Sequence, residues 1–128
     1  MVDTARDYAA ANGYKKICLL GTLPTMEGTF FQNSFSKRGV EVVTPNAEER
    51  KYIGTKIETE LEFGKVLPKT QSTFKEIAER IIREERVQAI VLGCTELPLI
   101  FDSVELPVLC IDVMQIHINT LVDLIMQN

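Results

Sequence analysis

The sequence has one histidine and three cysteines in 128 residues, and the cysteines show no paired spacing. Unpaired cysteines are typical of a reducing compartment rather than of a disulfide-rich secreted protein. No apolar run is long enough to cross a bilayer, so no membrane association is expected. The N-terminus lacks the basic-then-apolar layout of a signal peptide. Together these absences predict a cytoplasmic protein.

The sequence also lacks a cluster of basic residues. Lysine and arginine are scattered, and the formal net charge is −4, so no nucleic-acid partner is expected. The hydrophobic fraction of 45% and the charged fraction of 25% are ordinary for a soluble globular protein. The length of 128 residues predicts a single domain.

Short apolar runs alternate with helix-forming segments along the chain. Strands are expected at residues 16–21, 40–43, 89–92 and 107–111. Unbroken apolar runs suit parallel strands that are covered on both faces. Strands that alternate with helices imply a parallel sheet with right-handed crossovers. The predicted fold class is therefore α/β, a three-layer αβα sandwich with a parallel sheet of about four strands.

Capping residues predict where three of the helices begin. These are Thr25, Asn46 with Glu49, and Thr73 with Glu76. The clearest helical periodicity lies in residues 74–82, where apolar side chains recur at the spacing of one helix face. A final helix is expected at residues 113–126. It is apolar around most of its circumference, which predicts burial on more than one side. Another domain or another copy of the chain should cover its second side, so a dimer or larger assembly is expected.

The segment 89–100 carries the candidate chemistry. A short buried strand is followed by Gly93, which permits a sharp turn, and then by Cys94 and Thr95. Parallel α/β proteins bind ligands beyond the carboxyl ends of their strands. Amides of the next helical turn could hold a carboxylate-sized anion there and lower the pKa of the thiol. Cys94 is therefore interpreted as a functional thiol, and Cys18 and Cys110 as buried core residues.

Two other kinds of residue keep more than one interpretation on spacing alone. Thr22 and Thr25 lie in the loop after the first strand, where turn and capping chemistry would account for them. His117, the one histidine, lies in an apolar stripe of the last helix. On that spacing a core position is favoured over a ligand-binding one.

Several motifs together resemble the aspartate/glutamate racemase family. They are Leu20-Gly21-Thr22 with Thr25, Leu92-Gly93-Cys94-Thr95-Glu96-Leu97-Pro98, and Ile111-Asp112 with His117. The match runs colinearly through almost all of the chain. The resemblance implies a racemase of aspartate or glutamate that uses neither cofactor nor metal. It also implies two similar α/β domains, each supplying one cysteine, with the small amino-acid substrate between them.

The resemblance carries residue roles to this sequence. Cys94 would be the acid/base of the second domain, and Glu96 could assist proton traffic beside it. Thr22, Thr25 and Thr95 would bind the substrate carboxylate, with His117 as a further substrate-binding residue.

The chain departs from the family in its length and in its cysteines. Residues 1–128 resemble the C-terminal half alone, as a single racemase-like domain without the N-terminal partner domain and its cysteine. The chain would then supply one of the two bases needed for racemisation. The expected partner is a second copy in a homodimer, or a complementing N-terminal half.

Two other functions remain open from the sequence. Relatives with a single cysteine at the Cys94 position decarboxylate malonate-type substrates or isomerise diacids, because one thiol can protonate one face of a carbon. A non-catalytic α/β module that self-associates through its exposed helices is the third possibility.

Overall fold

The computed structural model describes residues 2–126, in which strands and helices alternate. The strands are β1 (Lys16–Leu20), β2 (Glu41–Val43), β3 (Ala89–Leu92) and β4 (Leu109–Asp112). The helices are α1 (Val2–Ala11), α2 (Leu23–Glu27), α3 (Phe30–Ser36), α4 (Ala47–Thr59), α5 (Pro68–Glu85), α6 (Leu97–Phe101) and α7 (Val113–Met126), with a short 3₁₀ turn η1 (Leu61–Phe63). No helix in this part of the chain is long and apolar enough to span a membrane.

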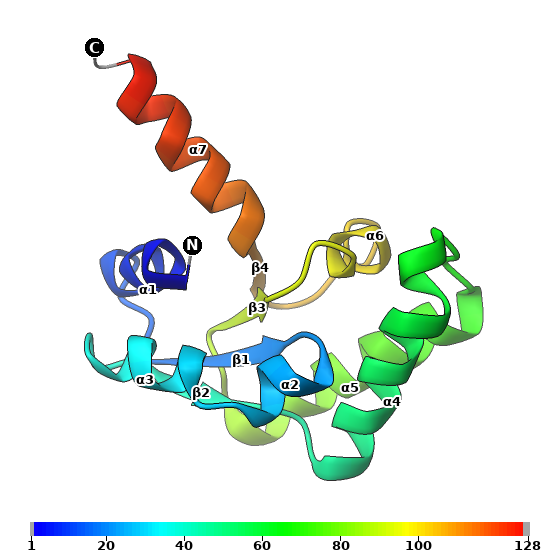
Figure 1. The fold of residues 1–128 in the computed structure, drawn as a ribbon. Coiled ribbons are helices and arrows are strands. Elements are labelled where there is room, and N and C mark those ends of the chain that lie inside the picture. The colour runs from blue at the N-terminus through cyan, green and yellow to red at the C-terminus, as the bar shows by residue number, and fades with distance from the viewer. Residues whose placement is uncertain (1, 127–128) are drawn as a thin grey trace.

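Within the described residues, four strands form one parallel sheet in the order β2-β1-β3-β4. The two central strands are covered on both faces: residues 17–20 of β1 and all of β3 are buried. Alternate residues of a strand point to opposite faces, so each central strand contributes to two separate cores. One core packs against α4, α5 and α6, and the other packs against α1 and α3 (Figure 1). The predicted αβα sandwich is confirmed.

The starts of α4 and α5 differ in how well the sequence predicts them. The capping box of α4 is confirmed: the Glu49 amide donates to Asn46 Oδ1 at 2.9 Å, and the Asn46 amide donates to Glu49 Oε1 at 3.1 Å. The predicted box at Thr73 is wrong. Helix α5 begins at Pro68, because proline suits a first helical turn that lacks amide partners. Thr73 therefore lies inside the helix, where its hydroxyl donates to the Lys69 carbonyl.

The segment after β1 forms two short helices rather than the single helix expected from Thr25. Helix α2 begins after Thr22, with Pro24 in its first turn, so the prediction of Thr25 as the N-cap is wrong. Gly28 ends α2 in an extended conformation, and α3 starts after it. Thr25 consequently lies within α2, one helical turn from Thr22.

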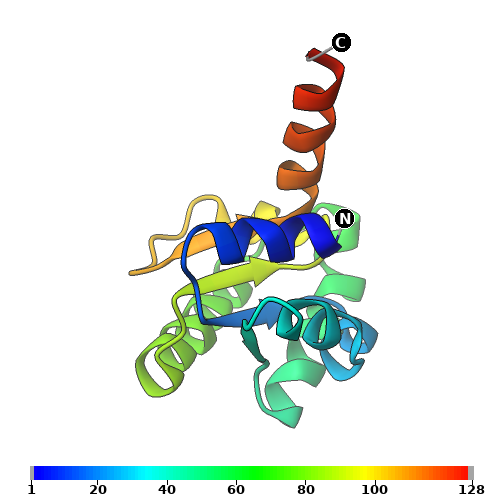
Figure 2. The same cartoon turned by 90° about the vertical axis from the view of Figure 1, so that its left-hand side faces the viewer.

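Helix α7 has the predicted bounds, but only its beginning packs against the rest of the chain. Val113 is buried, and the partly buried Ile116 packs against the core that α1 and α3 cover. The helix then projects away from the sheet, as both views show (Figures 1 and 2). The sheet and α1 therefore cover only the first turns of a helix that is apolar along its whole length.

Candidate active site

The carboxyl ends of β1, β3 and β4 lie together at one edge of the sheet. Leu20 is in register with Leu92, and Leu92 is in register with Asp112, so the residues that follow these three positions emerge side by side. The Gly93 amide donates a hydrogen bond of 2.8 Å to the Leu20 carbonyl and ties the two central loops together. The site predicted at the end of the 89–92 strand therefore adjoins the loop that carries the two threonines.

Glycine gives these loops room to approach each other closely. A Cβ atom on Gly93 would lie 3.1 Å from Leu19 Cδ1 and 3.2 Å from the Leu20 carbonyl oxygen. A Cβ atom on Gly21 would lie 3.1 Å from Thr25 Cγ2. These approaches are closer than ordinary carbon contacts, so larger residues would push the loops apart. The two glycines hold Thr25 directly against the turn that leads to Cys94.

The threonine hydroxyls are paired with each other. Thr22 Oγ1 and Thr25 Oγ1 lie 2.9 Å apart, and the pair is partly buried. Thr22 is the N-cap residue of α2, yet its side chain makes no capping hydrogen bond. Helix capping therefore does not account for its hydroxyl, which instead faces its neighbour at the sheet edge.

The sulfur of Cys94 is half-buried and receives two backbone hydrogen bonds. Burial is the largest effect and raises the pKa of the Cys94 thiol to about 11, while hydrogen bonds from the Glu96 and Leu97 amides oppose that rise. The expectation of a lowered pKa is wrong, because α6 has five residues and its first amides do not outweigh the desolvation of the thiolate. Cys94 is consequently a protonated thiol at neutral pH.

Glu96 lies beside the thiol as the sequence suggested. Its carboxylate accepts a hydrogen bond from Cys94, and its charge further raises the pKa of that thiol. Thr95, between them, is exposed at the sheet edge. The structure thus brings the predicted trio of Cys94, Thr95 and Glu96 to one turn.

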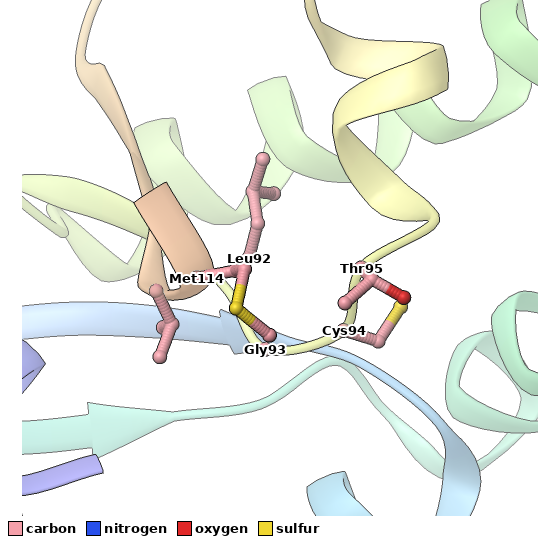
Figure 3. Close-up of a pocket in the computed structure, with 6 residues that line it drawn as sticks. Leu92, Gly93, Cys94, Thr95 and Met114 are labelled. Carbon is pink, nitrogen blue, oxygen red and sulfur yellow. The ribbon is translucent and has the colours of Figure 1, made fainter. Parts of the chain in front are cut away.

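A small open hollow of about 20 Å³ lies at this turn. It is lined by Leu92, Gly93, Cys94, Thr95, Val113 and Met114. In Figure 3, Cys94 and Thr95 lie on the loop after β3, and Met114 approaches from the beginning of α7. A volume of this size holds about one water molecule, so the hollow is one wall of a site rather than a complete amino-acid pocket.

Sequence reasoning missed the apolar part of this wall. Leu92, Val113 and Met114 were assigned to the core or to the apolar helix, yet all three line the hollow. The signal was available in the strand order: β4 is the neighbour of β3, so the first turn of the following helix must emerge beside Cys94.

The other residues considered from the sequence, His117, Cys18 and Cys110, do not line the hollow at the Cys94 turn. His117 is partly buried and is not among the residues that line the hollow, and its Nδ1 atom is buried without a hydrogen-bond partner within residues 2–126. Cys18 is fully buried, and burial raises its pKa to about 12, which confirms the core interpretation. Cys110 packs against the core as predicted but is only partly buried, because β4 is an edge strand.

Solved structures of other proteins share this fold. An aspartate racemase homologue from Pyrococcus horikoshii OT3 is 32% identical, with a TM-score of 0.89 over 96% of this chain and 54% of its own. A candidate Asp/Glu racemase from Yersinia pestis is 30% identical, with a TM-score of 0.84 over 91% of this chain and 50% of its own. An aspartate racemase from Picrophilus torridus, at 22% identity and a TM-score of 0.57 over 78% of this chain and 40% of its own, shares the fold.

This chain spans about half the length of the solved proteins that it matches. The family model for Asp/Glu/hydantoin racemases matches residues 1–121, which include the threonine loop, the Cys94 turn and most of α7. The chain therefore belongs to the Asp/Glu/hydantoin racemase family.

Proposed function

We propose that this chain forms one wall of a cofactor-independent racemase site for aspartate or glutamate, with Cys94 as one of two acid/base groups at Cα. The observation that carries the proposal is the thiol itself. Cys94 lies at the carboxyl edge of the sheet, receives amide hydrogen bonds on its sulfur and borders an open hollow. A thiol at the site described for this fold class can reach a bound ligand, unlike one inside a strand.

The protonation state decides the first role of Cys94. With a pKa of about 11, the side chain holds its proton at neutral pH and acts as the acid. A base on the opposite face removes the Cα proton, and Cys94 delivers its own proton to the near face. The sulfur is left as a thiolate, which the Glu96 and Leu97 amides stabilise. In the reverse direction that thiolate is the base, and Glu96 is placed to exchange a proton with it.

The substrate carboxylate requires fixed donors, because a Cα proton beside an ionised carboxylate is very weakly acidic. The paired hydroxyls of Thr22 and Thr25 and the exposed Thr95 are the available donors beside Cys94. Donors that are already in place stabilise negative charge as it develops during proton removal. We assign carboxylate binding to these three residues. Thr22, Thr25 and His117 do not line the hollow, but Thr25 packs against Gly93 beside Cys94, whereas the support for His117 is the family resemblance alone.

Inversion requires a second group on the far side of Cα, and Cys94 cannot occupy both faces. A second copy of the chain or a complementing N-terminal half would supply that group and close the site against water. The family implies a small amino-acid substrate, and a cytoplasmic setting would keep the thiols reduced.

Exchange of the Cα proton in D₂O tests this function with the chain as it exists. Each enantiomer of aspartate and of glutamate is incubated with the protein, and deuterium at Cα is measured by NMR. Cys94→Ala should reduce the exchange rate by at least about 100-fold, the usual contribution of an acid/base group. Cys110→Ala is the matched control, because this second partly buried thiol is not among the residues that line the hollow. Absence of exchange with all four enantiomers, also with a complementing half added, would contradict the proposal.

A single-cysteine decarboxylase or isomerase is the second candidate, and one observation favours it. Leu92, Val113 and Met114 give the hollow an apolar wall, and none of the residues that line it carries a charge. Such a wall suits the hydrocarbon substituent of an arylmalonate better than a second carboxylate. Turnover of arylmalonates or maleate, lost in Cys94→Ser, together with no Cα exchange in amino acids, would favour this candidate over racemisation.

A further inference from the structure

Helix α6 carries the backbone groups that hydrogen-bond to the Cys94 sulfur, yet it is only five residues long. The Glu96 and Leu97 amides, which donate to the thiol, lie at its beginning. A helix this short has almost no stability of its own, because its few internal hydrogen bonds do not offset the cost of forming a helical turn. Contacts with the rest of the chain must therefore decide where these two amides lie.

Apolar packing holds α6 in the core but does not fix its orientation. Leu97 and Ile100 are fully buried, and Phe101 packs against Phe74 of α5 with the ring centroids 6.2 Å apart. These contacts stabilise the buried position, but the hydrophobic effect is not directional. A short helix held by them alone could still rotate or shift along its axis. Hydrogen bonds, which do have a preferred direction, are needed to fix it.

Gln71 of α5 supplies two such bonds at the other end of α6. Its Nε2 atom donates to the Ile100 carbonyl at 2.9 Å and to Ser103 Oγ at 2.8 Å. In a longer helix the Val104 amide would bond to the Ile100 carbonyl, but here it donates to the Phe101 carbonyl at 3.1 Å. The last carbonyls of a helix need partners from outside it, and Gln71 meets this need for Ile100.

We propose that Gln71 is a positioning residue for the Cys94 thiol: its side chain fixes α6 against α5, and α6 in turn holds the Glu96 and Leu97 amides on the sulfur. The anchor is firm, because α5 has 18 residues and buries one face in the core. Gln71 is not among the residues that line the hollow, so it acts through α6 rather than on a substrate. The effect is measured on the thiol itself, so it does not depend on the proposed function.

Alkylation of Cys94 by iodoacetamide tests the proposal, because only the thiolate reacts. Gln71→Met removes the amide group, nearly keeps the length of the side chain and introduces no charge. Loss of the aligned amides should raise the pKa of Cys94 by about half a unit to one unit, so the rate at pH 8 should fall about three- to tenfold. Glu96, whose charge acts on this thiol, is unchanged in the variant. Gln71→His keeps an N–H donor at a similar reach and should restore most of the rate.

Gln88→Met is the matched control, because Gln88 also ties distant backbone together, at the opposite edge of the sheet. Its Oε1 atom accepts hydrogen bonds from the Lys15 and Lys16 amides, where β1 begins. Both methionine variants should lower the urea midpoint of unfolding, which is what a merely structural role predicts. Only Gln71→Met should change the pH–rate profile of Cys94.

Hydrogen exchange of the Glu96 and Leu97 amides, measured by NMR, gives a second readout. Exchange should quicken about three- to tenfold in Gln71→Met and stay unchanged in Gln88→Met, because only the first variant frees α6. A Cys94 profile that is unchanged in Gln71→Met, or that shifts equally in both variants, would overturn the proposal. Faster alkylation in Gln71→Met would overturn it too, because Gln71 would then shield the thiol rather than align its donors.

Discussion

Cys18 lies inside the central strand β1, whereas Cys94 lies in the loop after the neighbouring strand β3, and this difference in position gives the two thiols different environments. Cys18 lies within β1, in register with Ile90, whereas Cys94 lies two residues beyond the end of β3. Burial raises the pKa of both thiols, to about 12 for Cys18 and to about 11 for Cys94. Only Cys94 also receives amide hydrogen bonds and borders an opening. Access and hydrogen-bond donors, rather than a lowered pKa, distinguish the candidate functional thiol from the structural one.

Alkylation of the native protein should show the largest difference between the two thiols. Cys94 should react with iodoacetamide at least about 100-fold faster than Cys18, because Cys18 becomes accessible only when the fold opens. The Cys94 rate should be below that of a free thiol at pH 7 and should rise about tenfold per pH unit until the pH approaches 11, since only the thiolate reacts. Peptide mapping by mass spectrometry measures both rates. Equal labelling of the two cysteines would contradict this comparison.

Replacement of each cysteine by serine should lower the unfolding free energy by a different amount. Cys18→Ser places a hydroxyl in an apolar core, and an unpaired buried polar group costs about 1–3 kcal/mol of unfolding free energy. Cys94→Ser should cost less than about 1 kcal/mol, because the site is half-buried and already offers the Glu96 and Leu97 amides. Urea denaturation measures both values. The reverse order would mean that the Cys94 turn, rather than the strand, is the tightly packed environment.

The contrast between buried strand interiors and the loops at strand ends also explains how much of the fold the sequence predicts. The buried strands β1 and β3 are unbroken apolar runs, and α5 follows a clear helical period, so their positions follow from burial alone. The predicted start of α5 was wrong. Thr73 has the residue type of a cap, but Pro68 begins the helix five residues earlier. A capping residue type is a local signal, and it does not show which of two possible starts the packed chain uses.

The candidate site was predictable only as far as it lies on contiguous sequence. Cys94, Thr95 and Glu96 share one turn, and their grouping follows from the sequence directly. The part played by Met114 depends on β4 lying beside β3, which is a property of the sheet order rather than of local sequence. The pKa of Cys94 was predicted in the wrong direction, because residue order does not reveal how strongly a sulfur is desolvated.

Glu96→Gln should change the pKa of Cys94 and leave the pKa of Cys18 as it is. The variant removes a negative charge and a carboxylate acceptor that both hold the proton on Cys94, so the pKa of Cys94 should fall. Each half unit of that fall raises the thiolate fraction at pH 8 about threefold, and the alkylation rate of Cys94 should rise by about three- to tenfold. Cys18 should not respond, because Glu96 is not among the charges that affect its pKa. A pH–rate profile that is unchanged would exclude Glu96 as the partner of the thiol.

Substitutions of Thr25 should change stability and binding least, because this one side chain contacts both the packed glycine turns and the open edge of the sheet. Its Cγ2 methyl packs against the Gly21 and Gly93 turns, while its hydroxyl pairs with Thr22 at the sheet edge. Thr25→Val keeps the methyl and should change the unfolding free energy by about 0.5 kcal/mol, because Thr22 can bond to water instead. Thr25→Ser removes the methyl and should cost about 1 kcal/mol. Urea denaturation separates the two variants, and amino-acid titration of the Cα exchange rate should show weaker binding for Thr25→Val alone. If Thr25→Ser weakens binding equally, packing of the turn rather than the hydroxyl holds the substrate.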